Sequence, residues 1–260
     1  MIRSLALLAV SATTATTLSA QQADFRWEKA LAAGSTVSLH NLSGDVTVGP
    51  STTGKVEVVG IKHGRDRSDI TLTVVETSRG ITVCPLIKDA DMDCDEDGFR
   101  MHSHHHDDDW DDASIDMQVK VLTTMLLNAH SVSGNVSVTG MQDRVRAGSV
   151  SGDVRLEASN VSSIKASSVS GDVSVRIASL TGTGALEFSS VSGNITAELP
   201  RNVDADVSMR SVSGELDSEF PLTLNGRMNR RSLEARIGKG GRDLEVHTVS
   251  GDVRLRMAKQ

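Results

Sequence analysis

Aromatic residues are scarce in this chain of 260 residues, which has two Trp, four Phe and no Tyr, and it also has only four Pro and two Cys. The core must therefore be built from Val, Leu, Ile and Ala, and sugar-binding platforms of stacked aromatic rings are not expected. The net charge of −7 argues against a basic face, so nucleic acid is not an expected partner. No window of about 18 apolar residues occurs, so no transmembrane segment is expected in the mature chain.

The N-terminus has the pattern of a secretory signal peptide. Arg3 precedes the apolar run 5–10, and a stretch of small residues ends at Ala20. The apolar run is too short to anchor the chain in a bilayer. We expect residues 1–20 to be removed and the mature chain to be exported to the periplasm, the cell surface or the medium. A frayed N-terminal helix of a cytosolic protein is the alternative.

Export determines how the two cysteines are interpreted. Cys84 and Cys94 are ten positions apart, and in an oxidising compartment such a pair is expected to form a disulfide. Closing a loop of about 11 residues would stabilise the fold by roughly 2.5 to 3 kcal/mol. Two free thiols that contribute to a metal site are the alternative.

A short repeat dominates the rest of the chain. Its seven copies are NLSGDVTV (41–48), SVSGNVSV (131–138), SVSGDVRL (149–156), SVSGDVSV (168–175), SVSGNITA (190–197), SVSGELDS (211–218) and TVSGDVRL (248–255). Apolar residues alternate with polar ones after each Ser-Gly-Asp/Asn step, which predicts a turn followed by a strand with one buried face. The long step between the last two copies predicts a degenerate copy near Gly226 to Gly238.

The spacing of the copies predicts the architecture. Consecutive copies between 131 and 218 lie 18 to 22 residues apart, the length of one coil of a β-solenoid. One coil cannot bury enough apolar surface to fold alone, so the coils must stack. We expect an all-β, single-chain β-solenoid over 35–258, preceded by a cap or linker at 21–34. Residues 35–87 repeat less clearly and form either irregular first coils or a separate small β-domain.

These repeats resemble a known family. The SVSGDV units, the stretch RIGKGGRDLEVHTVSGDVRLR (236–256), the segment ITVCPL (81–86) and the run into the repeats (114–138) are similar to the DUF4097 family of adhesin-like, exported bacterial β-strand-repeat proteins. The resemblance covers about residues 35–258 and implies a β-strand-repeat fold. It does not imply one particular function.

The polar residues of the repeats form a column if the turns align. This column contains Asn135, Asp153, Asp172, Asn194 and Glu215, with Ser133, Ser151, Ser170, Ser192 and Ser213 two positions before them. Cation binding or polysaccharide cleavage is one interpretation. We favour turn chemistry repeated with the turn, because each side chain stands where the turn requires it. The histidines outside the acidic segment, His40, His63, His130 and His247, are isolated and are expected to be surface or strand residues.

One segment departs from the repeat. Residues 88–112 hold eleven acids against two bases, so we expect a solvated inserted loop that carries the excess negative charge. Asp93, Asp95 and Asp97 are spaced like the first half of a calcium loop, although the Glu of its last position is missing. Imidazoles followed by carboxylates suit zinc, nickel or copper. The metal-ligand candidates are Asp93, Asp95, Asp97, His102, His104, His105, His106, Asp107 and Asp109.

Three functions follow from these features. The leading hypothesis is a non-enzymatic, adhesin-like module that binds an unidentified protein or polysaccharide of the cell envelope or surface. The alternative is an envelope protein that binds divalent metal, calcium or zinc, through the acidic and His-rich loop. A polysaccharide-active β-helix enzyme is the weakest hypothesis, because no residue stands out as a catalytic base. No cofactor is expected apart from such a metal ion.

Overall fold

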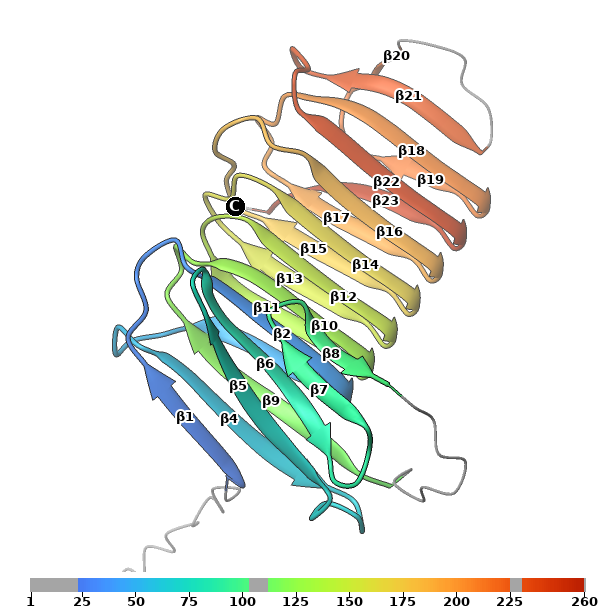
Figure 1. Ribbon diagram of the computed structural model, residues 1–260. Coiled ribbons are helices and arrows are strands. Elements are labelled where there is room, and N and C mark those ends of the chain that lie inside the picture. Colours follow the sequence, from blue (N-terminus) through green and yellow to red (C-terminus); the bar gives the residue numbers. More distant parts are fainter. Residues whose placement is uncertain (1–22, 103–111, 225–230, 260) are drawn as a thin grey trace, which may run out of the picture.

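The computed structural model describes residues 23–102, 112–224 and 231–259. These residues form strands and turns without a helix, so the expected all-β class is confirmed. Two large sheets lie face to face, and the strands of each sheet follow one another along one axis, as Figure 1 shows. Only the β7–β8 hairpin, β7 (Met92–Asp95) and β8 (Gly98–Met101), lies outside them among the described strands.

We call the two large sheets A and B. In both of them, the order of the strands departs from the order in the sequence at each end of the sheet. Sheet A runs through β1 (Phe25–Lys29), β4 (Val56–His63), β9 (Ser114–Val121), β3 (Val46–Pro50), β11 (Val136–Met141), β13 (Val154–Ala158), β15 (Val173–Ile177), β17 (Ile195–Leu199), β23 (Val253–Met257) and β19 (Leu216–Ser218). Sheet B runs through β20 (Thr223–Leu224), β21 (Ser232–Ile237), β18 (Ala205–Ser213), β22 (Asp243–Ser250), β16 (Leu186–Ser192), β14 (Ile164–Ser170), β12 (Val145–Ser151), β10 (Leu126–Ser133), β2 (Thr36–Ser43), β6 (Gly80–Ile87) and β5 (Ile70–Thr77).

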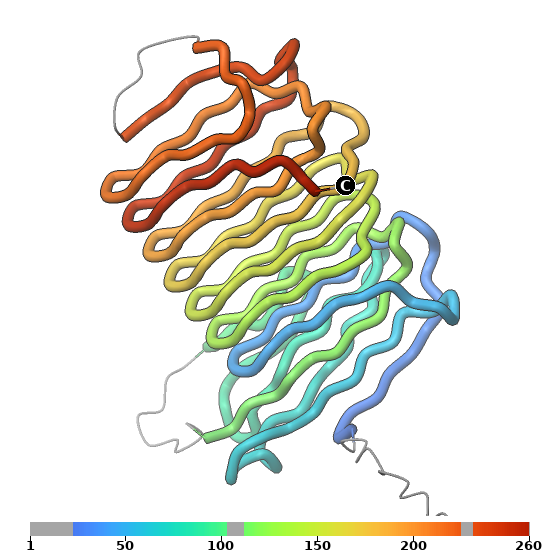
Figure 2. Tube along the Cα trace, turned by 180° about the vertical axis from the view of Figure 1, so that it is seen from behind, coloured from blue at the N-terminus to red at the C-terminus, as the bar shows by residue number. Residues whose placement is uncertain are grey.

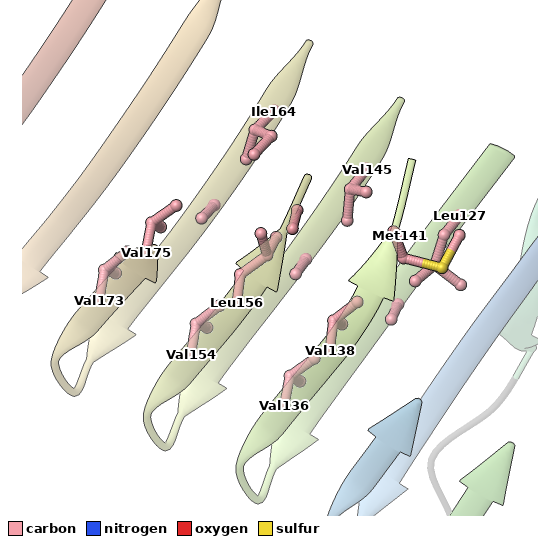
Figure 3. Close-up of a cluster of buried hydrophobic side chains, with 14 of the residues drawn as sticks. Leu127, Val136, Val138, Met141, Val145, Val154, Leu156, Ile164, Val173 and Val175 are labelled. Atoms are coloured by element: carbon pink, nitrogen blue, oxygen red, sulfur yellow. The ribbon is translucent and has the colours of Figure 1, made fainter. Parts of the chain in front are cut away.

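Each motif copy joins the two sheets. The first three residues of a copy are the last residues of a strand in sheet B. The Gly-Asp/Asn step then turns the chain, and the residues that follow form a strand of sheet A. Equivalent residues pair in parallel between neighbouring copies, as in Leu127 with Val145 and Val145 with Ile164. The alternating apolar side chains point between the sheets, and Figure 3 shows how they pack in columns. The core therefore needs no large aromatic ring apart from a few sites such as Phe188.

The turn glycines allow the copies to stack closely. A Cβ atom on Gly193 would lie 2.1 Å from the carbonyl oxygen of Gly171 in the neighbouring copy. The backbone of Gly193 is not in the left-handed region, so the close approach alone excludes a side chain there. The tight turns form one regular edge of the molecule, which we call the turn edge and which Figure 2 shows from behind.

The C-terminal copy does not lie last in the stack. β22 pairs with β16 on one side and with β18 on the other, so the copy at 248–255 is inserted between those at 190–197 and 211–218. In Figure 1 the red β22 accordingly lies between orange strands. The prediction of a degenerate copy near Gly226 to Gly238 is wrong for the described residues. The copies pair in parallel, whereas β21 pairs antiparallel with β18 and β20. The long spacing between the last two copies reflects this excursion and return.

Antiparallel strands close the opposite end of the stack. β4 pairs antiparallel with β9 and with β1, and β5 pairs antiparallel with β6. β2 and β3 lie between this end and the regular copies, so strands from 35–87 belong to both large sheets. The irregular segments thus end the parallel stack with strands of opposite direction, which hinders the addition of further parallel strands.

We expect the substitution Gly193→Ala to lower the free energy of unfolding by about 3 kcal/mol, because the new methyl group would overlap the Gly171 carbonyl. The urea midpoint at an unchanged m-value measures this loss. Ser192→Ala is the control, since this neighbouring side chain is exposed. An unchanged midpoint for Gly193→Ala would show that the close approach does not constrain the stack.

Candidate functional site

Two ladders of hydrogen bonds hold the turn edge together. In the first, the hydroxyl at the start of a motif donates to the carbonyl oxygen of the turn glycine in the neighbouring copy, over 2.8 to 3.1 Å. The donors are the buried Ser131, Ser149, Ser168, Ser190, Ser211 and Thr248. The serines named in the sequence analysis, two positions further on, are exposed instead. The repeat letters alone did not distinguish the buried serine from the exposed one.

The second ladder is made by the acidic and amide side chains of the turns. Each side-chain oxygen accepts a hydrogen bond of 2.8 to 3.0 Å from the backbone N–H of the equivalent residue in the next copy. In spatial order the ladder runs from Asp116 of β9 through Asp45, Asn135, Asp153, Asp172, Asn194 and Asp252 to Glu215, which contributes only its backbone N–H. These contacts support the interpretation as turn chemistry, because the oxygens already satisfy backbone donors.

Aliphatic side chains are exposed along the same edge. They stand at the second position of each motif, between its buried hydroxyl residue and its exposed serine, and between 39% and 53% of their surface is accessible. The row consists of Val132, Val150, Val169, Val191, Val249 and Val212, with the half-buried Leu42 in the equivalent place of the first copy. Neighbouring strands are about 4.8 Å apart, so these side chains form a continuous apolar stripe, here the valine stripe. The stripe could have been expected from the sequence, since this valine precedes the turn in copy after copy.

The first part of the acidic segment is an ordered hairpin. The β7–β8 hairpin packs against β6 and β2 on the outer side of sheet B, as Figure 1 shows. A disulfide joins Cys84 of β6 to Cys94 of β7, as expected, with the two Cα atoms 6.0 Å apart. Thr82 of β6 also donates a hydrogen bond of 3.2 Å to the carbonyl oxygen of Glu96. This part of the segment is thus bound to the sheet and is not a solvated loop.

The structure divides the predicted metal ligands. His104, His105, His106, Asp107 and Asp109 lie outside the described residues. Within the described ranges, no group of three or more His, Cys, Asp or Glu side chains could hold a metal ion.

The aspartates of the hairpin have other partners. The Oδ1 atom of Asp95 accepts a hydrogen bond of 2.8 Å from the backbone N–H of Asp97. The Nη2 atom of Arg100 lies 3.0 Å from a carboxylate oxygen of Asp95 and 3.1 Å from one of Asp97. Asp93 lies 3.3 Å from His102. The half calcium loop is therefore the turn of a β-hairpin, and the binding of metal by the whole segment stays a prediction.

A cleft of about 540 Å³ lies on the outer face of sheet B, and we call it the sheet-B cleft. Its floor includes His40 of β2 and His130 of β10, whose rings stack with centroids 6.0 Å apart. Both histidines directly precede a motif copy, and the parallel register places them side by side. The prediction that they are strand residues is confirmed, whereas the prediction that they are isolated is wrong. His247 directly precedes the last copy in the same way, so the shared position was the available signal.

Burial keeps the two imidazoles of the cleft neutral over a wider pH range. It lowers the pKa of His40, and the neighbouring His130 lowers it further. Burial also lowers the pKa of His130, to which the positive charge of Arg146 adds. Neutral imidazoles can both donate and accept hydrogen bonds, which suits a polar ligand.

Arg242 is a buried residue that sequence reasoning missed. Its guanidinium donates hydrogen bonds to the carbonyl oxygens of Ser162, Thr181, Gly182 and Gly184, in the loops that join the preceding copies. Burial lowers its pKa. Because Arg242 directly precedes β22, these bonds fix the entry of the inserted C-terminal copy. A single Arg in a polar stretch gave no sign of this position.

The comparisons identify the family. The chain matches Toastrack DUF4097 over residues 16–256. It belongs to the Toastrack DUF4097 family. No curated protein matches this Toastrack chain.

Two crystal structures are similar to this Toastrack chain. One is named a "putative cell adhesion protein" from Clostridium sporogenes; the match has a TM-score of 0.52 and 8% identity and covers 90% of this chain and 99% of that one. At this identity the likeness shows the fold alone. The other is named a "putative adhesin" from Bacteroides fragilis, with a TM-score of 0.40, 13% identity and coverage of 90% of this chain and 96% of that one.

We expect the stability of this Toastrack chain to fall as the pH is lowered from 7.5 to 5.5. The unfolded imidazoles, with an ordinary pKa of about 6.5, take up protons first, whereas the folded His40 and His130 have lowered pKa values. The two imidazoles therefore make their full contribution to the free energy of unfolding above pH ~6.5. This contribution is lost as the pH falls towards their pKa values in the folded protein. Urea unfolding across this range should show a shallower decline for His40→Asn/His130→Asn.

The charged groups that line the cleft with these rings are Arg144, Arg146, Arg79, and Glu96 and Asp97 of the hairpin turn. His247→Asn, at an exposed site on the same sheet face, is the control and should keep the wild-type decline. An equal decline in the double variant would show that the two rings do not cause it.

For the acidic segment we expect calorimetric titration with Zn²⁺ to give binding heat that is lost when His102, His104, His105 and His106 are replaced by Asn. Imidazole nitrogen is a preferred zinc ligand, and these replacements leave the disulfide and the β7–β8 strands in place. Ca²⁺ is titrated in parallel, with Asp93→Asn/Asp97→Asn as its own variant. Zinc heat that persists in the histidine variant would place the site elsewhere.

Proposed function

We propose that this Toastrack chain is an exported, non-enzymatic β-solenoid with coils of 18 to 22 residues, acting as an adhesin-like interaction module at the cell envelope or surface. The observation that carries the proposal is the valine stripe. Single exposed apolar residues are common on proteins, but a contiguous row of them is typical of a binding surface.

The position of the stripe favours binding over folding as its role. The valine side chains point away from the core, so polar residues could replace them without loss of internal packing. Covering each half-exposed valine would contribute about 0.5 to 1 kcal/mol to binding. A row that runs along the stack suits an extended partner, because one contact recurs at each strand.

Other observations agree with export and a surface role. The Cys84–Cys94 disulfide is the kind of bond that persists in oxidising compartments. No helix of the described residues is long and apolar enough to cross a membrane. The structurally similar protein from Clostridium sporogenes bears a cell-adhesion name, which is said of that protein. The carboxylates of the turn ladder serve backbone donors, which favours a scaffold over a catalytic site.

Binding of the mature protein to isolated cell envelopes and to intact cells of the producing bacterium tests the proposal. Val150→Thr/Val169→Thr/Val191→Thr keeps the β-branched shape and strand preference while it removes apolar surface. We expect this variant to bind at least about tenfold more weakly than the wild type.

Ser151→Ala/Ser170→Ala/Ser192→Ala is the matched control, because these exposed side chains lie one position further along the same turns. It should bind as the wild type does. Wild-type protein that binds neither preparation, or a valine variant with undiminished binding, contradicts the proposal.

A further inference from the structure

We propose that the sheet-B cleft binds acidic oligosaccharides, with Arg144 and Arg146 holding a sugar carboxylate and the neutral floor of the cleft contacting hydroxyl groups. This site is separate from the valine stripe. It lies on the outer face of sheet B, whereas the stripe follows the turn edge. The two sites can therefore be tested independently.

One side of the cleft carries positive charge. Arg144 and Arg146 flank the buried Val145, so both side chains emerge on the outer face of sheet B, where they are exposed. Within the described part of the chain, neither guanidinium has a carboxylate partner. Two neighbouring guanidinium groups present several donors to one carboxylate, the geometry in which arginine binds anions most strongly.

The opposite side is formed by the β7–β8 hairpin, whose two acids that line the cleft, Glu96 and Asp97, are both ion-paired. Glu96 lies 3.5 Å from Arg79, and Asp97 lies 3.1 Å from Arg100. The two hairpin acids that line the cleft are thus paired with arginines of their own side, whereas Asp93 and Asp95 do not line it. Because Cys94 is bonded to Cys84, this wall is held at a fixed place on sheet B.

The floor between these sides consists of neutral hydrogen-bonding groups. Asn128 donates a hydrogen bond of 3.3 Å to Ser38, and next to this pair lie the stacked rings of His40 and His130. Room for the His130 ring is provided by Gly148, where a Cβ atom would lie 2.8 Å from the ring nitrogen Nδ1. Neutral donors and acceptors of this kind suit the hydroxyl groups of a sugar.

The cleft continues along the stack. A second hollow of about 310 Å³ shares His130 and Arg146 with it and extends to Lys165 and Ser167 of β14. The positive charge of Lys165 is balanced by Glu187 at 2.7 Å. The combined groove crosses successive strands and suits an extended ligand.

The distribution of charge favours an acidic sugar over other anions. The chain has a net charge of −7, which opposes close approach to an extended anionic surface such as a membrane of acidic phospholipids. The groove offers a small cationic patch beside neutral donors, and it lacks the aromatic rings on which neutral sugars commonly stack. A carboxylate together with many hydroxyl groups matches this arrangement.

Calorimetric titration with oligogalacturonate, at low salt and on the mature full chain, tests the proposal. We expect binding that weakens as salt is added, and at least a tenfold loss of affinity in Arg144→Gln/Arg146→Gln. The methyl ester of the same oligosaccharide lacks the charge and should bind at least tenfold more weakly than the acid. Arg144→Gln alone serves as a second variant and should show a smaller loss.

Arg155→Gln/Arg176→Gln removes the same charge from the outer face of sheet A and is the matched control, with less than a twofold change expected. The valine-stripe variant should also retain oligogalacturonate binding. The proposal is overturned by absence of binding, by equal affinity for the methyl ester, or by equal losses in the two arginine variants. Inorganic phosphate or phosphatidylserine vesicles that bind through Arg144 and Arg146 more tightly than oligogalacturonate would also overturn the assignment to a sugar.

Discussion

The close contact between turn glycines of successive copies is the constraint on which the rest of the structure depends. The carbonyl oxygen of Gly171 occupies the space that a side chain on Gly193 would need, and the same contact recurs along the turn edge. This approach brings the buried hydroxyl of one copy to the glycine carbonyl of the copy before it in the stack. It also brings the carboxylate or amide of one turn to the backbone of the next, as between Asp172 and Asn194. The hydrogen bonds of the edge, the parallel register of both sheets and the columns of valine and leucine all follow from it.

The same regularity leaves three surfaces available for other roles. At the turn edge, the residue between two serines points outward and forms the valine stripe. On the outer face of sheet B, equivalent positions carry different side chains in successive copies. His40, His130 and Gly148 are neighbours in this way, and the sheet-B cleft results from their differences. The third surface belongs to the acidic segment, whose β7–β8 hairpin forms one wall of the cleft. Sheet A carries ion pairs on its outer side, such as Arg176 with Glu198, and these two residues line a smaller hollow of about 250 Å³.

Much of the fold could be predicted because its signals are local. The Ser-Gly-Asp/Asn step requires a turn wherever it occurs, and the alternation of Val154, Arg155 and Leu156 requires a strand with one buried face. The disulfide could be predicted because it joins residues ten positions apart. The order of the copies could not be predicted, because copies with the same letters can pair in any order. β22 therefore pairs with both β16 and β18, and Arg242 fixes this arrangement through carbonyl groups that carry no sequence signature.

The candidate sites, like the fold, divide into features that the sequence predicts and features that only long-range contacts create. From the sequence alone came the turns, the strand faces, the cysteine pair and the structural role of the aspartates, because each depends on neighbours along the chain or on the repeat itself. Only the tertiary structure paired His40 with His130, placed Arg146 beside them, and turned the half calcium loop into a hairpin wall. His40 and His130 are 90 positions apart, and β2 and β10 become neighbours because the chain between them builds the antiparallel end of the two sheets and then returns. Local chemistry thus determined the unit of this protein, and long-range strand pairing decided which units meet and where a ligand can bind.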